Sequence, residues 1–308
     1  MNIIKHRYLY FAISMLIIVP GIIALIIWGL HPAIDFTGGS MLEIKFDSGK
    51  APQPAEVFAF YEKEGIADAE VQSSGTDGLI IRSSEISEET KTKLISDMET
   101  TYNSKITINS FETVGPTIGQ EVTTRAMWAV ALAALAIILY ITFAFRGVPH
   151  AVRYGTAAIM AMIHDVLVVV GMEALLGHFV GWEADSLFLT AVLTVIGFSV
   201  HDTIVVFDRI RENSNIYRRL SFTEVVNHST VQTLARSINT QLTVMLCLLA
   251  MALFGGVTIR HFVTILLIGV LSGTYSSIFN ASPILVVWEN REWRNWFHPS
   301  QWKEMISK

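Results

Sequence analysis

An aspartate set within a long apolar stretch is the side chain of this sequence best suited to proton or ion chemistry. Ser186–Phe207 is apolar and long enough to cross a bilayer, which takes roughly 20 residues, yet it contains His201 and Asp202. An ionised carboxylate in hydrocarbon costs at least about 2.5–3.5 kcal/mol, so such groups are rare and commonly belong to an ion or proton path. We therefore predict that Asp202 takes up and releases a proton, and a purely structural role is the alternative.

Two more polar residues could complete a coupling site with Asp202. Asp165 follows His164 near the middle of another apolar run, where ion coupling and hydrogen bonding between helices are both open. Arg236 stands at the polar start of a later run, and it could face Asp202 across an aqueous vestibule or simply flank the membrane as a cation. Glu173 lies nearer the outer end of its run, and we interpret it as interfacial.

Six apolar runs of membrane-spanning length must position these residues. The chain has 308 residues, of which 52% are hydrophobic and 16% charged, whereas about 25% of residues are charged in soluble domains. Gly269 and Gly273 are four residues apart in the last run, a spacing that lets helices pack closely in lipid. Ser221 and Glu224 form a capping box that predicts the start of a helix, which we expect to lie at the membrane surface and to lead into the fifth run. The predicted spans are Tyr8–Leu30, Ala126–Phe145, Tyr154–Leu176, Ser186–Phe207, Ser237–Ile259 and Phe262–Trp288.

The charges of the short loops predict the orientation of the spans. Lysine and arginine gather at the N-terminus, in the loops after the second and fourth runs, and in the C-terminal tail. Because the cytoplasmic loops of membrane proteins carry an excess of these residues, we expect both termini in the cytoplasm and residues 31–125 on the outer side. This outer segment holds 16 Asp and Glu against 8 Lys and Arg.

The outer segment is predicted to fold as a small α+β domain. Its hydrophobic pattern and turn signals give the order β-α-β-β-α-β, which is that of a ferredoxin-like sandwich. The predicted elements are 41–46, 54–64, 69–73, 79–82, 87–102 and 105–114. A glycine-rich turn is expected on each side of the domain. The residues of these turns are Asp35, Gly38, Gly39, Gly115, Pro116 and Gly119.

The expected fold class is an α-helical integral membrane protein with six transmembrane helices and a small ferredoxin-like extracytoplasmic domain between spans one and two. Its parts are an N-terminal segment with helix one (1–34), the outer domain (35–122), helices two to six (123–288) and a cytoplasmic tail (289–308). The sequence has no basic patch with interleaved aromatic residues, and no nucleophile–base or metal-ligand cluster stands out. We therefore expect no nucleic-acid partner, no metal, no cofactor and no enzymatic activity.

Six motifs spread over the whole chain resemble those of the SecD/SecF family of bacterial protein-export proteins, and of its SecF branch in particular. They occur in the family's order, and SecD differs in having a much larger outer domain and another sequence in place of the first motif. The motifs are DFTGG at 35–39, VGPTIG at 114–119, HDVLVVVG at 164–171, HDTIVVFDRIREN at 201–213, ARSINTQLT at 235–243 and GTYSSIFNASPIL at 273–285.

The resemblance implies a fold of the resistance-nodulation-division type, in which six helices pair with those of SecD into a pseudo-symmetric unit of twelve. It implies a multi-pass protein of the bacterial cytoplasmic (inner) membrane that uses the proton-motive force to assist translocation on the outer side. The implied partners are SecD, the SecYEG translocon, YajC and unfolded secretory polypeptides, besides the lipid bilayer.

The resemblance also assigns roles to single residues. Asp202 matches the family's titrating aspartate, and Arg236 matches the arginine at the start of span five. His201 stands where an asparagine is expected, so it would add a second titratable group beside Asp202. Asp165 matches a family motif whose role in coupling is less defined, and whether the coupled ion is H⁺ or Na⁺ is open.

Other functions remain open at the level of the sequence. A small-molecule exporter of the same superfamily would share these helices and would alter drug susceptibility independently of secretion. An intramembrane aspartyl protease would also use two aspartates, although no Gly-x-Gly-Asp motif is present. A membrane scaffold would tolerate the loss of charge at Asp202.

Overall fold

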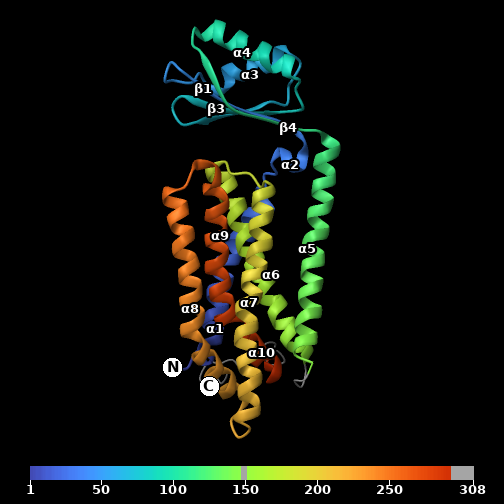
Figure 1. Ribbon diagram of the computed structural model, residues 1–308, viewed down its shortest axis with the longest axis vertical. Helices are drawn as coiled ribbons and strands as arrows, with labels where there is room; N and C mark the ends of the chain where they lie inside the picture. Colours follow the sequence, from blue (N-terminus) through green and yellow to red (C-terminus); the bar gives the residue numbers. More distant parts are fainter. Residues whose placement is uncertain (147–150, 293–308) are drawn as a thin grey trace. The chain divides into compact units, whose positions relative to one another are not determined.

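The chain folds into two compact units. The computed structural model describes residues 1–146 and 151–292, so most of the predicted tail, 289–308, lies outside the described residues. Unit 1 consists of Met1–His31 and the described residues from Trp128 onward, and unit 2 consists of Pro32–Met127. Each unit has its own hydrophobic core. Figure 1 shows a long helical bundle and a small sheet covered by two helices.

Six helical stretches of the described residues are long and apolar enough to cross a membrane. In α6, α7 and the last stretch about half of the apolar window is buried, whereas α5 and α8 are largely exposed. The first three therefore form the core of the bundle. The stretches are α1 (Arg7–Ile27, preceded by η1, Ile4–His6), α5 (Pro116–Ala144), α6 (Ala151–Val180), α7 (Ser186–Ile216), α8 (Phe222–Phe254), and α9 (Val257–Ser276) continued by the π-helix η2 (Ser277–Ala281) and α10 (Ser282–Glu289).

Capping residues explain where the bundle helices begin and end. The side chain of Asp185 accepts a hydrogen bond from the backbone N–H of Phe188 and so starts α7. The capping box of Ser221 and Glu224 is present and starts α8. The helix predicted to start here leads into the fifth span without a break, because α8 runs from the capping box through that span. That span also ends at Phe254 rather than at Ile259, since two glycines follow it.

Two glycines bring the first helix against the third span. A Cβ atom built on Gly171 of α6 would lie 2.6 Å from the Cα atom of Gly21 in α1, and one on Gly21 would lie 2.9 Å from the Cα atom of Gly171. Neither position has room for a side chain, so the two backbones are in direct contact. Small residues of this kind permit close helix packing in lipid.

Unit 2 is a four-stranded antiparallel sheet with two helices. The strand order is β2-β3-β1-β4, and the chain order β1-α3-β2-β3-α4-β4 agrees with the order predicted from the sequence. Alternate residues of β1, namely Leu42, Ile44 and Phe46, are buried beneath α3 and α4, which cover one face (Figure 1). The bounds are β1 Gly39–Phe46, α3 Pro54–Lys63, β2 Glu70–Ser74, β3 Gly78–Ser83, α4 Glu88–Tyr102 and β4 Ile106–Val114.

The two glycine-rich motifs of unit 2 pack against each other. Asp35 lies in a single helical turn, α2 (Ile34–Thr37), and Gly38 follows it with φ +76°. A Cβ atom on Gly38 would lie 2.7 Å from the Cα atom of Pro116, and one on Gly119 would lie 2.7 Å from the backbone nitrogen of Gly38. The prediction of two turns is therefore wrong in form: the first motif is one helical turn, and the second is the start of α5.

Neighbouring residues of these motifs fix the ends of the sheet. Gly39 has φ +121°, pairs with Val114 across β1 and β4, and would place a Cβ atom 2.5 Å from the carbonyl oxygen of Ser83. Gly115 separates β4 from α5. The two motifs are about eighty residues apart in sequence, and together they hold the two ends of unit 2 side by side.

Candidate functional site

Asp202 is buried within the bundle and is held by two serine hydroxyls. Its residue is 3% exposed and lies in the middle of α7. Ser237 of α8 donates to one carboxylate oxygen at 2.7 Å, and Ser277 of η2 donates to the other at 2.6 Å. Hydroxyl donors stabilise an ionised carboxylate without neutralising it. The group therefore keeps the chemistry of a proton acceptor inside an apolar bundle.

Asp165 forms a second buried carboxylate site, between α6 and α9. It is fully buried, and Ser272 and Ser276 of α9 donate to its two oxygens at 2.7 and 2.6 Å. The Nδ1 atom of His164 lies 2.9 Å from the oxygen that Ser272 also contacts. Asp165 thus accepts hydrogen bonds from a neighbouring span, as expected if its role is to hold helices together. It also has an ionisable neighbour in His164.

Two adjacent serines connect the two aspartates. Ser276 ends α9 and bonds to Asp165, whereas Ser277 begins the π-helix η2 and bonds to Asp202. Because these serines are consecutive, the two carboxylates lie at the same level of the sixth span, although they come from different helices. We call Asp165, Asp202, Ser276 and Ser277 the aspartate–serine cluster. π-Helical segments are rare and frequently occur at functional sites.

Small residues of α9 allow this cluster to form. A Cβ atom on Gly273 would lie 3.4 Å from the Cα atom of Ser199 and 3.7 Å from a carboxylate oxygen of Asp165. A Cβ atom on Gly269 would lie 2.1 Å from the side chain of Val195, which leaves no space for one. These glycines draw α9 against α7 and α6, and that approach brings the serines within hydrogen-bond distance of both aspartates.

The structure does not bring every predicted site residue into the cluster. Arg236 is exposed at the surface of α8, and the described residues show no ion pair between it and Asp202. Its chain neighbour Ser237 makes the contact instead. His201 is also exposed, because it lies about 100° around α7 from Asp202. Among the described residues, Asp202 is therefore contacted by serine hydroxyls and not by the predicted cation, Arg236.

Sequence reasoning missed the serines and the partner of one acid. Ser237, Ser272, Ser276 and Ser277 carry no charge, and only their helical spacing relative to a buried carboxylate could have indicated their role. Glu173, interpreted as interfacial, is 2% exposed and pairs with His261 of α9, whose Nε2 atom lies 2.9 Å from a carboxylate oxygen. Its burial between α6 and α9 was not expected, and its position near the membrane interface stays a prediction.

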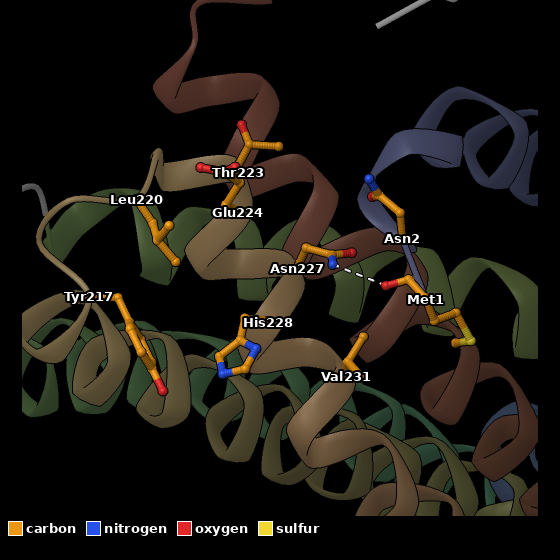
Figure 2. Close-up of a pocket in the computed structure, with 9 residues that line it drawn as sticks. All are labelled: Met1, Asn2, Tyr217, Leu220, Thr223, Glu224, Asn227, His228 and Val231. Carbon is orange, nitrogen blue, oxygen red and sulfur yellow. Dashed lines mark hydrogen bonds between the residues drawn. The ribbon is translucent and has the colours of Figure 1, made fainter.

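A separate pocket lies at the N-terminal end of unit 1. It has a volume of about 410 Å³ and is formed by the first residues of the chain and the start of α8. Figure 2 shows Asn227 reaching toward Met1, whose carbonyl oxygen accepts a hydrogen bond from the Asn227 amide at 3.1 Å. The pocket contains neither aspartate of the cluster, and the hydrogen bonds of Asn227 hold the first residues of the chain against α8.

Comparison with known proteins identifies relatives over the full length of the chain. The family model "Protein export membrane protein SecD/SecF, C-terminal" matches residues 94–291, and the model "SecD/SecF GG Motif" matches residues 23–50. Protein translocase subunit SecF of Anaerolinea thermophila is 57% identical over 298 residues, covering 96% of this chain and 97% of that protein. The subunit of the same name from Thermobaculum terrenum is 48% identical, covering 97% and 98%.

A solved structure of a larger relative has the same fold. The crystal structure of SecDF from Thermus thermophilus, described as a translocon-associated membrane protein, superposes with a TM-score of 0.81 at 32% identity. The match covers 94% of this chain but only 39% of the SecDF chain. With six helices able to span a membrane and with these relatives, the chain is a multi-pass membrane protein that belongs to the SecD/SecF family of protein-export proteins, in its SecF branch.

Proposed function

We propose that this chain acts with a SecD-type partner and uses the proton-motive force to assist polypeptide translocation through the Sec translocon on the outer side of the bacterial inner membrane. The observation that carries this proposal is the aspartate–serine cluster, where two buried carboxylates are joined through adjacent serines. Membership of a protein-export family supports the transport role. SecDF is a single longer relative of which this chain matches about two fifths, which supports SecD as the partner.

The serine hydroxyls suit a carboxylate that changes its protonation state. The Ser276 hydroxyl also lies 3.3 Å from the carbonyl oxygen of Gly273, and the Ser277 hydroxyl lies 3.2 Å from that of Thr274. When a carboxylate is ionised, the serine donates to it. When the carboxyl is protonated, its O–H can donate to the serine oxygen while the serine proton turns to the carbonyl. Both states therefore leave the buried polar groups paired, which avoids the penalty of an unsatisfied buried group.

A change at Asp202 has a structural route to the first helix. The π-helix η2 begins at Ser277 and contains Asn280, whose amide is hydrogen-bonded to Ser14 of α1 at 2.8 Å. Helix α1 leads directly into unit 2, which begins at Pro32. We infer that protonation of Asp202 changes the packing of η2 and, through α1, moves unit 2. Unit 2 would then act on the emerging polypeptide as a ferredoxin-like outer domain.

The gradient supplies enough free energy for such a switch. One charge crossing 100 mV provides about 2.3 kcal/mol, and each pH unit adds about 1.36 kcal/mol. One proton can therefore shift a two-state equilibrium by a factor of tens to hundreds, since about 1.4 kcal/mol is tenfold. That bias is sufficient to favour forward movement of a translocating chain over its return.

Arg236 and His201 lie where the proposal places the exit of the proton to the cytoplasm. The arginines that follow α7 and precede the apolar part of α8 favour a cytoplasmic location for that end. Both termini would then be cytoplasmic, and the proton would leave Asp202 near the exposed Arg236 and His201.

Arg236→Ala tests this exit. We expect the pH profile of export stimulation to change, and an unchanged profile would count against the exit.

The principal test is Asp202→Asn, with Asp208→Asn as the matched control on the same helix. Asp208 is exposed, so removing its charge should leave export stimulation close to that of the unaltered chain. Asp202→Asn should abolish the gradient-dependent stimulation while the protein remains inserted and bound to its SecD-type partner. Stimulation can be measured as voltage-dependent secretion into membrane vesicles. Normal stimulation by Asp202→Asn would refute the coupling role and leave a membrane scaffold.

A further inference from the structure

A second titratable pair lies in the bundle, away from the aspartate–serine cluster. Glu173 of α6 has a side chain that is 1% exposed, and its Oε2 atom lies 2.9 Å from the Nε2 atom of His261 in α9. The other carboxylate oxygen, Oε1, is buried and has no hydrogen-bond partner among the described residues. A buried carboxylate oxygen without a partner is costly, so this position calls for an explanation beyond packing.

His261 gives this pair its access to water. The side chain of His261 is 16% exposed, whereas Glu173 is closed off. The imidazole packs on the ring of Trp182, with centroids 4.6 Å apart, and Trp182 belongs to the short connection between α6 and α7. The proposed orientation puts this connection on the outer side of the membrane. His261 is therefore the member of the pair that meets protons arriving from outside.

The remaining charged groups at this end of unit 1 have other positions. His178 stacks on Trp28, Asp185 caps α7, and Arg260 is exposed. His31 and Glu183 lie in the connections that follow α1 and α6. Among the described residues, the ionic partner of Glu173 is thus the imidazole of His261.

The pair and Asp165 lie along the same seam between α6 and α9. Glu173 is eight residues beyond Asp165 on α6, which is roughly 12 Å along the axis. On α9, His261 precedes Ser272 by eleven residues, and eleven steps of about 100° return to nearly the same face. Val169 and Ile265, both fully buried, occupy the seam in between. This apolar stretch separates the two carboxylates until the helices repack.

We propose that Glu173 and His261 are the outer proton-loading group for Asp165, a role that rests on the proposed function above. A proton taken up by the neutral imidazole leaves Nε2 for Oε2 of Glu173, so His261 ends neutral and Glu173 ends as a carboxylic acid. When the seam opens, the acid gives its proton to the Asp165 carboxylate and Glu173 regains its charge. The closed apolar stretch prevents protons from leaking through the bundle between these steps.

The test measures export stimulation as a function of outer pH, in vesicles that contain the full chain with its SecD-type partner and translocon. Glu173→Gln keeps a hydrogen-bonding group beside His261 but cannot load a proton, and His261→Gln removes the imidazole. His178→Gln is the matched control, because it removes a histidine at the same end that makes no contact with Glu173. We expect both pair variants to stimulate export several-fold less at neutral outer pH. Acidifying the outer medium by about one unit, a tenfold rise in proton concentration, should largely restore them.

A spectroscopic measurement separates proton loading from a structural role. Infrared difference spectra of the full chain, recorded between two values of outer pH, should contain a carboxylic-acid band that Glu173→Gln removes and His178→Gln retains. If the Glu173–His261 pair had only a structural role, its variants would change the thermal stability of the chain without removing this band. The inference is overturned if Glu173→Gln keeps both the band and the outer-pH profile of the unaltered chain while Asp202→Asn abolishes stimulation. Normal stimulation by Asp202→Asn would instead refute the proposed function itself.

Discussion

Ser276 and Ser277 are adjacent in the sixth span but contact two different neighbouring helices. Two consecutive side chains of an α-helix point about 100° apart, which directs Ser276 toward α6 and Ser277 toward α7. The hydroxyls then reach Asp165 and Asp202 separately. The two carboxylates therefore contact consecutive residues of the same span.

Removing one hydroxyl should expose this dependence. Ser277→Ala leaves an oxygen of Asp202 without its donor, and an unsatisfied buried acceptor costs about 1–3 kcal/mol. We expect a lower thermal-unfolding temperature for the full chain in detergent and weaker gradient-dependent export. Ser282→Ala is the matched control, because the buried Ser282 hydroxyl has no hydrogen-bond partner among the described residues. Equal losses for both variants would contradict the role given to Ser277.

The sequence identifies the two aspartates of the cluster, but it does not identify the side chains that surround them. Asp165 and Asp202 stand out because charge is costly in an apolar run. Their serine partners are polar residues of ordinary frequency in such runs, and a helical periodicity alone does not tell which neighbouring helix they face. The burial of Glu173 was not foreseen for the same reason, since it depends on α9, whose His261 lies 88 residues further along the chain. Contacts between spans require knowledge of how the helices are arranged.

Glycines let the helices of the bundle pack closely, and the backbones of α1 and α6 are in direct contact at Gly21 and Gly171. Gly171→Ala would place a methyl group 2.6 Å from the Cα atom of Gly21, and overpacking of this kind costs about 1–3 kcal/mol. We expect a matching fall in thermal stability and a looser α1. Gly197→Ala serves as control, because a Cβ atom there has no neighbour within 4 Å. A Gly171→Ala chain as stable as this control would disprove the close contact.

The order and type of the elements follow from local physics, whereas their exact ends depend on capping. Hydrophobic runs of roughly 20 residues predict spans, and the alternation in β1 predicts a strand with one buried face. The helix expected to lead into span five is continuous with that span, because no residue between Thr223 and Arg236 breaks the helical hydrogen bonds of α8. Pro116 was taken for a turn residue, but it suits the first turn of a helix equally well.

The whole molecule consists of two units, and the chain passes between them after α1 and within α5. Gly38, Pro116 and Gly119 pack against one another within unit 2, near the two ends of its sequence. Two solved forms of SecDF match this chain to different degrees, with TM-scores of 0.81 and 0.68, which supports more than one arrangement in this family.

Coupling between the cluster and unit 2 should be visible as a change of distance. The exposed Cys247 is first replaced by serine, and spin labels are then attached at the exposed positions Thr92 of α4 and Val180 of α6. In vesicles, imposing a proton gradient should change the distance distribution between the labels if, as proposed, protonation of Asp202 changes the packing of η2 and α1. Asp202→Asn should remove the response, since its amide cannot change charge, whereas Asp208→Asn should retain it. If the gradient response persists in Asp202→Asn, a group other than Asp202 controls the movement of unit 2.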